Sequence, residues 1–142
     1  RLLEKWAVAL GGGGNHRMGL YDMVMLKDNH VDFAGGIKAA VARTKAYLAQ
    51  TNRTLAIEVE TRNLQEVKEA LQAGVDRIML DNFTVSATKE AVEYIAGRTE
   101  VESSGGITRH TLVPYAECGV DFISVGALTH HIKGLDMSLK AL

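Results

Sequence analysis

The stretch TLAIEVETRNLQEVKEALQAGVDRIMLDN, residues 54–82, predicts a strand, a helix and a second strand. An apolar run ends at Glu60, a segment of helical periodicity extends from Asn63 to Gly74, and a second apolar run ends at Asn82. Asn63 is a typical residue at a helix start, and glycine is typical just past a helix end. Two such strands joined by a helix predict a βαβ unit with parallel strands and a right-handed crossover.

The same alternation continues on both sides of this unit. Further apolar runs are DMVMLK ending at Lys27, TEVESS ending at Ser104 and DFISVG ending at Gly126, with the helical segments GIKAAVARTKAYLAQ, TVSATKEAVEYIAG and ITRHTLVPYAECG between the strands. Pro114 falls in the last helical segment, where it would disturb the first turn. The pattern predicts an α/β fold with a parallel sheet. Because a closed barrel of this kind needs about eight strands and roughly 250 residues, 142 residues predict an incomplete or open (β/α) TIM-like barrel.

The composition is that of a globular domain, which we expect to occupy residues 1–142. The net charge of −1 argues against nucleic acid or an anionic membrane surface as a partner. No apolar run approaches the roughly 20 residues of a membrane-spanning helix. Cys118 is the only cysteine, which excludes an internal disulfide and predicts a reducing, cytoplasmic compartment. Because the chain begins at Arg1 without methionine, we expect it to be a piece of a longer polypeptide.

Polar residues and glycine follow the predicted strands at the points where the strands end. In a parallel sheet these carboxyl ends share one rim, and that rim is where ligands bind. The sequence therefore predicts one site that combines a lysine, two acids, a hydroxyl and a glycine. These residues are Lys27, Glu60, Asp81, Ser104 and Gly126.

A run of four glycines precedes a cationic triplet in GGGGNHRMGLYD, residues 11–22. Glycine runs occur in ordered structure where the backbone turns sharply or approaches something closely, and a flexible linker is the alternative. Arg17 offers a fork of donors, His16 a further donor and Lys27 a point charge. Together they predict a pocket for an acidic small molecule. Taken singly, each is more typical of a solvated charge or a loop histidine, with Lys27 paired with Asp28, and only their combination favours the pocket.

The acidic residues of two neighbouring strands predict the other half of this site. Glu58 and Glu60 alternate along one strand and so point to the same face, with Glu58 one layer deeper and Glu60 at the rim. Asp81 takes the next rim position, beside Asn82. Carboxylates there can hold sugar hydroxyls, coordinate Mg²⁺ or stabilise a cationic transition state. The alternative is a structural ion network that neutralises Lys27 and nearby cations.

Two glycine-containing turns predict phosphate-binding loops. ESSGGI, residues 102–107, passes from a strand to a helix start, where exposed backbone N–H groups suit an anion. SVGALTH, residues 124–130, repeats the arrangement after the next strand. In barrels, adjacent loops of this kind near the end of the chain often share one phosphate. Glycine is also common in strand-to-helix turns that bind nothing.

Six motifs in this order closely resemble the carboxyl-terminal barrel domain of quinolinate phosphoribosyltransferase, and the resemblance covers essentially the whole chain. They are GGGGNHRMGLYD, LKDNHV, IEVET, IMLDNF, ESSGGI and GVDFISVGALTH. The resemblance implies a pentosyltransferase of NAD biosynthesis that joins quinolinate to phosphoribosyl pyrophosphate with Mg²⁺, leaving nicotinate mononucleotide, CO₂ and pyrophosphate. It also implies a two-domain protein whose amino-terminal domain is absent from this chain, and a homodimer in which the neighbouring subunit completes each site.

The resemblance also implies roles for individual residues. His16, Arg17 and Lys27 would hold the carboxylates of quinolinate, and the catalytic set would be Lys27, Glu60 and Asp81. Glu60 and Asp81 would face the ribose and the metal-bound pyrophosphate, contacting Mg²⁺ directly or through water. The loops that hold the 5-phosphate correspond to Ser104, Gly105, Gly106, Gly126 and Ala127.

Two other functions stay open at this stage. One is a paralogous barrel that acts on another acidic substrate, such as the relatives associated with molybdenum transport, although the presence of both His16 and Arg17 argues against it. The other is a module that binds a phosphosugar without turnover, which the short length permits.

Overall fold

The computed structural model describes residues 1–130 and 134–141. These residues form two compact units. The larger unit, residues 16–125, contains the sheet and most of the helices. The smaller unit combines residues 1–15 with the described residues from Gly126 onward.

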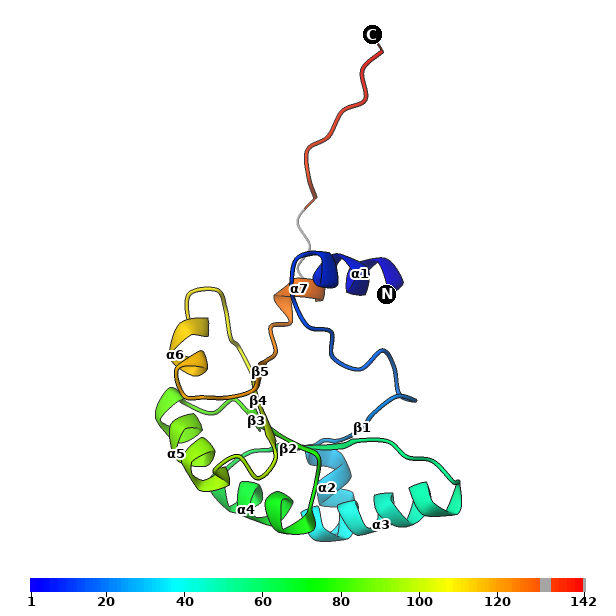
Figure 1. The fold of residues 1–142 in the computed structure, drawn as a ribbon, viewed down its shortest axis with the longest axis vertical. Coiled ribbons are helices and arrows are strands. Elements are labelled where there is room, and N and C mark those ends of the chain that lie inside the picture. The colour runs from blue at the N-terminus through cyan, green and yellow to red at the C-terminus, as the bar shows by residue number, and fades with distance from the viewer. Residues whose placement is uncertain (131–133, 142) are drawn as a thin grey trace. The chain divides into compact units, whose positions relative to one another are not determined.

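All the strands of the larger unit belong to one parallel sheet in sequential order (Figure 1). The strands are β1 (Val24–Leu26), β2 (Ile57–Thr61), β3 (Arg77–Asp81), β4 (Glu100–Ser104) and β5 (Phe122–Ile123). The predicted α/β fold with parallel strands is therefore confirmed. Within the described residues the sheet ends at β1 and β5, which fits the predicted open form.

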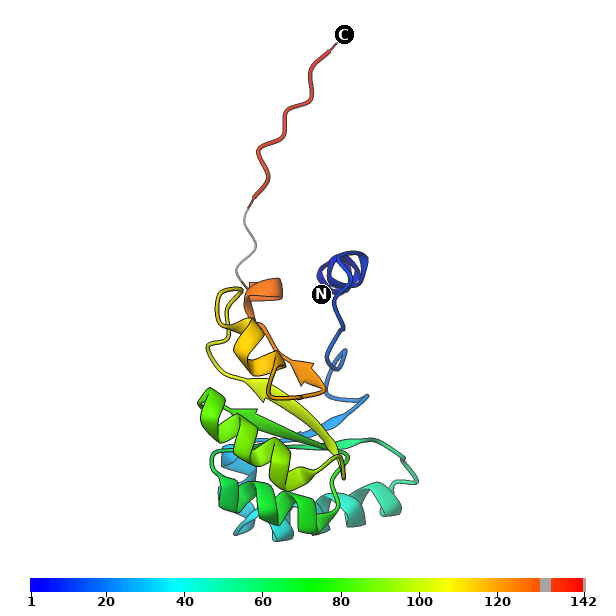
Figure 2. The same ribbon diagram turned by 60° about the vertical axis from the view of Figure 1, so that its left-hand side comes forward.

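Helices of the larger unit pack against one face of this sheet, as Figures 1 and 2 show. They are α2 (Asp28–Ala34), α3 (Ile37–Gln50), α4 (Leu64–Ala73), α5 (Val85–Ile95) and α6 (Leu112–Ala116). The predicted boundaries of α4 are confirmed: the side chain of Asn63 accepts the Glu66 N–H, and Gly74 adopts the left-handed conformation at the other end. Among the described residues, no helix has both the length and the apolar character needed to cross a membrane.

The hydrophobic core lies between the sheet and these helices. Val59, Ile78 and Leu80 alternate along β2 and β3 toward the helices, and each is 0% exposed. Burial of one such side chain contributes about 1.5–3 kcal/mol relative to exposure. The intervening residues of the same strands point to the opposite face, so this packing fixes which side chains face away from the helices.

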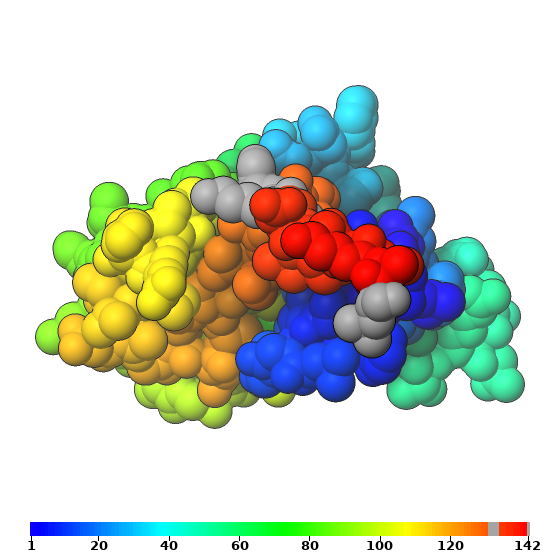
Figure 3. Space-filling model, turned by 90° about the horizontal axis from the view of Figure 1, so that it is seen from above, coloured from blue at the N-terminus to red at the C-terminus, as the bar shows by residue number. Residues whose placement is uncertain are grey.

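The predicted last helix of the larger unit is much shorter than expected. The sequence pattern places it from Ile107 to Gly119, but α6 spans only Leu112–Ala116. Pro114 explains the difference, because proline has no N–H to donate and fits only the first turn of a helix. The preceding segment is an exposed turn, yellow in Figure 3, in which the Thr111 hydroxyl accepts the Thr108 N–H.

The smaller unit contains α1 (Leu2–Leu10), α7 (Ala127–His130) and the glycine run. The run forms an ordered turn rather than a flexible linker. Gly12 has a φ of +82°, the Gly13 N–H donates to the Val8 carbonyl, and Asn15 donates to the Lys5 carbonyl. A Cβ at Gly13 would lie 2.9 Å from the Val8 side chain, so the close approach excludes a larger residue.

Candidate active site

Two of the predicted residues form an ion pair at the rim of the sheet. Lys27 follows β1 directly, and its Nζ lies 2.8 Å from Oε2 of Glu60 on β2. The hydrogen bond to Glu60 raises the pKa of Lys27, and the charge of Asp81 acts in the same direction. Lys27 therefore pairs with Glu60 rather than with Asp28, and it lies within the field of both predicted acids.

The predicted residues at the ends of β3 and β4 also lie side by side. Asp81 accepts a hydrogen bond of 2.7 Å from the Asn82 amide, and the Asn82 N–H donates to the Ser104 carbonyl at 2.9 Å. Gly105 follows with a φ of +95°, and a Cβ there would lie 2.3 Å from Asn82 Oδ1. The glycine is thus required by a close approach between the two strand ends. Gly106 also has a positive φ, of +60°.

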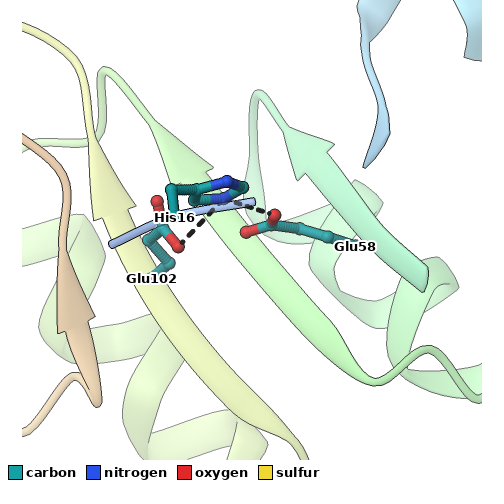
Figure 4. Close-up of side chains that lie close together, drawn as sticks. All are labelled: His16, Glu58 and Glu102. Atoms are coloured by element: carbon teal, nitrogen blue, oxygen red, sulfur yellow. Dashed lines mark hydrogen bonds and ion pairs between the residues drawn. The ribbon is translucent and has the colours of Figure 1, made fainter. Parts of the chain in front are cut away.

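A buried cluster lies deeper on the same face of the sheet (Figure 4). His16 Nε2 is 2.9 Å from Oε2 of Glu58 on β2 and 3.6 Å from Oε2 of Glu102 on β4. Glu58 is 0% exposed and Glu102 is 1% exposed. The predicted layering of Glu58 below Glu60 is therefore confirmed, since the Glu60 side chain keeps 11% exposure.

Arg77 and Glu102 are the members of this cluster that the sequence analysis did not identify. Arg77 Nη1 lies 3.3 Å from Glu102, its Nη2 lies 2.8 Å from Glu100, and its guanidinium stacks 3.9 Å from the centre of the Phe122 ring. The Ser124 hydroxyl donates a hydrogen bond to Glu102. Alternation was the available signal, because Glu102 precedes Ser104 by two residues just as Glu58 precedes Glu60.

The electrostatics of the cluster favour a positive charge on His16. The hydrogen bond from His16 to Glu58 raises the pKa of the imidazole, against the opposing effect of burial. Burial raises the pKa of Glu102, while the Ser124 hydroxyl opposes that shift.

The cluster has metal-ligand chemistry but does not fit a metal ion. The donor atoms of His16, Glu58 and Glu102 lie within 4.8 Å of one another. However, the Arg77 guanidinium already places a positive charge 3.3 Å from Glu102. The rim acids fit Mg²⁺ better, because Mg²⁺ is usually bound by one or two carboxylates together with substrate phosphates. Glu60 and Asp81 are both partly exposed and can supply such oxygens.

Arg17 lies in a loop with local restraints. Its N–H donates to His16 Nδ1 at 2.7 Å, and its Nη1 donates to the Met23 carbonyl at 3.3 Å. The Asp22 carboxylate accepts the N–H groups of Met18 and Gly19. These bonds order the segment that carries the predicted cations.

The remaining predicted residues belong to the smaller unit. Ala127 begins α7, and the Gly126 carbonyl accepts the N–H groups of Thr129 and His130. The larger unit therefore places Lys27 beside Glu60, and Asp81 beside Ser104 and the glycines that follow it. His16 lies deeper, at Glu58, and the Arg17 guanidinium lies at the Met23 carbonyl, just before the start of β1.

An open hollow of about 590 Å³ lies at the other end of the strands, away from these residues. Two of its lining acids, Asp76 and Asp121, accept the N–H groups of Ile57 and Val101 on neighbouring strands. Their carboxylates therefore fasten strand starts together, which is a structural role.

The fold defines an α/β protein with an open parallel sheet, whose strands end in a rim of charged side chains and glycine turns. A family profile described as "Quinolinate phosphoribosyl transferase, C-terminal domain" matches residues 1–140. The chain belongs to this family.

Individual relatives support this family membership. The nicotinate-nucleotide pyrophosphorylase (carboxylating), chloroplastic, of Arabidopsis thaliana is 52% identical over 99% of this chain and 44% of that protein. A probable nicotinate-nucleotide pyrophosphorylase (carboxylating) of Methanocaldococcus jannaschii is 44% identical over 96% of this chain and 50% of its own length. The crystal structure of NadC from Streptococcus pyogenes matches with a TM-score of 0.87 and 43% identity over 99% of this chain and 48% of that one. The chain thus spans about half the length of these relatives.

Proposed function

We propose that the protein carrying this chain transfers a phosphoribosyl group from phosphoribosyl pyrophosphate to quinolinate and decarboxylates the product. The products are nicotinate mononucleotide, CO₂ and pyrophosphate, and the reaction serves NAD biosynthesis. One observation carries this proposal: Lys27, a cation suited to a carboxylate, lies at the same rim of the sheet as Glu60 and Asp81, which are acids suited to a ribose and a metal. Family membership and the names of the relatives support the choice of substrates.

In this proposal the cations bind quinolinate. Arg17 pairs with one carboxylate through its guanidinium fork, and Lys27 and His16 supply charge to the other. Lys27 is half exposed, so it can reach a ligand while remaining paired with Glu60. Because the ion pair orients the Lys27 amine, little reorganisation is needed when the acid binds.

The rim acids act on the sugar. As pyrophosphate leaves, the C1′–O bond breaks and positive charge develops on C1′, which Glu60 and Asp81 stabilise before the quinolinate nitrogen forms the new C1′–N bond. The same two carboxylates would hold Mg²⁺, directly or through water, and the ion would neutralise charge on the pyrophosphate. Loss of CO₂ then leaves its electron pair beside the cationic ring nitrogen, and a solvent proton replaces the carboxylate.

The 5-phosphate is assigned to the two glycine turns. Ser104, Gly105 and Gly106 form the turn beside Asp81, and Gly126 with Ala127 forms the second. The positive φ values of Gly105 and Gly106 support this assignment, because such conformations turn successive N–H groups toward an anion.

Dimerisation completes the proposed enzyme. Helix α1 exposes the apolar side chains of Leu2, Leu3, Trp6 and Leu10, which supports burial against another part of the assembly. We propose a homodimer in which the neighbouring subunit contributes to each site. The cytoplasmic location expected from the single cysteine stays a prediction.

The test is a product assay on the full-length gene product with phosphoribosyl pyrophosphate, Mg²⁺ and either quinolinate or nicotinate. We expect nicotinate mononucleotide and labelled CO₂ from carboxyl-labelled quinolinate, and no product from nicotinate. Turnover of a different acid would favour the paralogue. Saturable binding of the phosphosugar without product would favour the binding module.

A further inference from the structure

The buried cluster of His16, Glu58, Glu102 and Arg77 is costly for a purely structural feature. Burying charged groups is generally unfavourable unless every group is paired, and apolar side chains in the same space would stabilise the fold as well or better. Yet Glu58 is 0% exposed, and its Oε1 has no hydrogen-bond partner among the described residues. A carboxylate kept in that state points to a role beyond packing.

The hydrogen bonds of His16 determine where its protons lie. Glu58 accepts from Nε2 at 2.9 Å, and a carboxylate can only accept, so Nε2 carries a proton. The Arg17 N–H donates to Nδ1 at 2.7 Å, so Nδ1 carries no proton in this arrangement. His16 is thus held as the Nε2–H tautomer, and Nδ1 is the only ring atom that can gain a proton.

Three charged side chains that act on the imidazole come from the sheet. Glu58 comes from β2, Glu102 from β4 and Arg77 from β3, while Arg17 is the adjacent residue in the loop. The two carboxylates favour the protonated ring, and Arg77 opposes it. A negatively charged ligand near Nδ1 would favour the protonated ring, as the two carboxylates do, and would offset the opposing charge of Arg77.

We propose that Glu58 and Glu102 are positioning residues that hold a proton on His16 Nε2, so that binding of the dicarboxylic substrate draws a second proton from solvent onto Nδ1. This inference rests on the proposed function, since it names quinolinate as the acid. On binding, Nδ1 changes from an unprotonated acceptor of the Arg17 N–H to a protonated donor toward a substrate carboxylate. The proton is taken from buffer, so one acid bound corresponds to one proton consumed.

Calorimetry tests this coupling directly on the full-length gene product. Quinolinate is titrated at pH 8 in two buffers that differ in their enthalpy of protonation, and the difference in heat gives the protons taken up. We expect uptake approaching about one proton per acid when His16 is neutral beforehand. Equal heats in the two buffers, with clear binding, would overturn the inference and leave the proposed function intact. No quinolinate binding in either buffer would instead contradict the proposed function.

Variants identify the groups responsible. Glu58→Gln keeps an acceptor for Nε2–H but removes the charge, so proton uptake should fall toward zero and quinolinate affinity at pH 8 should fall by about tenfold or more. The matched control is Glu66→Gln. Glu66 lies on the outer helix α4, and its carboxylate pairs with Arg62, which precedes that helix. This variant should leave both quantities unchanged. Undiminished proton uptake in Glu58→Gln would overturn the role of Glu58.

Nitrogen NMR of the imidazoles gives a readout that needs no variant. His16 in the unliganded protein should show the Nε2–H tautomer, and quinolinate should convert it to the doubly protonated ring at the same pH. The Nδ1–H tautomer would overturn the inference. So would displacement of the Nε2 proton by added Zn²⁺ at stoichiometric concentration, because the cluster would then be a metal centre.

Discussion

The two faces of the parallel sheet use the same strands for different purposes. The face toward the helices carries Val59, Ile78 and Leu80, which are completely buried in the core. The opposite face carries Glu58, Arg77 and Glu102 at the intervening positions. Glu58 and Glu102 pair with His16, and Arg77 pairs with Glu102. This difference shows that neighbouring residues of one strand can serve different purposes, one stabilising the core and the next lining the candidate site. Substitutions at adjacent residues are therefore expected to alter different properties, either the free energy of unfolding or the catalytic rate.

Leu80→Ala should show the largest effect, and it should be on stability. Leu80 is 0% exposed within the core, so its truncation leaves a cavity and should lower the free energy of unfolding by about 2–5 kcal/mol. Urea unfolding measures this change. Under conditions where the variant stays folded, kcat should stay close to that of the unchanged protein. A specific loss of kcat in the folded variant would break the proposed division between the faces.

Asp81→Asn should show the reverse behaviour at the very next residue. Asp81 is partly exposed at the rim, so the free energy of unfolding should change little. Loss of its charge near C1′ and Mg²⁺ should lower kcat by about 10²–10³-fold. Steady-state kinetics of the full-length gene product provide the measurement. A variant that retains full kcat would remove Asp81 from the catalytic set.

Arg17→Ala tests the loop that leads to the charged face. The guanidinium is assigned to a quinolinate carboxylate, so its loss should raise KM for quinolinate by about 10–100-fold. KM for phosphoribosyl pyrophosphate should change far less. Arg53→Ala, which removes an exposed arginine after α3, is the matched control. An unchanged quinolinate KM in Arg17→Ala would contradict this assignment.

The smallest expected effect is the pH dependence of stability from His16. Because the hydrogen bond to Glu58 raises the pKa of His16 in the folded state above 6.5, its contribution is fully present below pH 6.5. It is then lost as the pH rises through the folded-state pKa. His16→Gln should therefore destabilise the protein more at pH 6 than at pH 8, by about 1 kcal/mol. Equal destabilisation at both pH values would show that the imidazole stays neutral in the fold.

The sequence predicted the sheet and its rim well because both follow from local patterns. Alternation placed Glu58 below Glu60, and the strand ends placed Asp81 beside Ser104. Partner choice was harder, because it depends on the register between strands. Lys27 pairs with Glu60, 33 residues away, and not with the adjacent Asp28.

The same reason explains what the sequence did not reveal. The contact of Arg77 with Glu102 joins β3 to β4, and no spacing along the chain predicts it. The length of α6 was also overestimated, because hydrophobic periodicity outweighed the single proline at position 114. Both differences arise where a specific steric or cross-strand contact decides the structure.

The most direct test of the division between the two faces is an NMR titration of the isotope-labelled full-length protein with quinolinate. The account predicts shifts for Arg17, Lys27 and Glu60 on the charged face, with no comparable shifts along α3 (Ile37–Gln50) or α4 (Leu64–Ala73) behind the sheet. Shifts concentrated at Asp76 and Asp121, in the hollow at the opposite end of the strands, would contradict it.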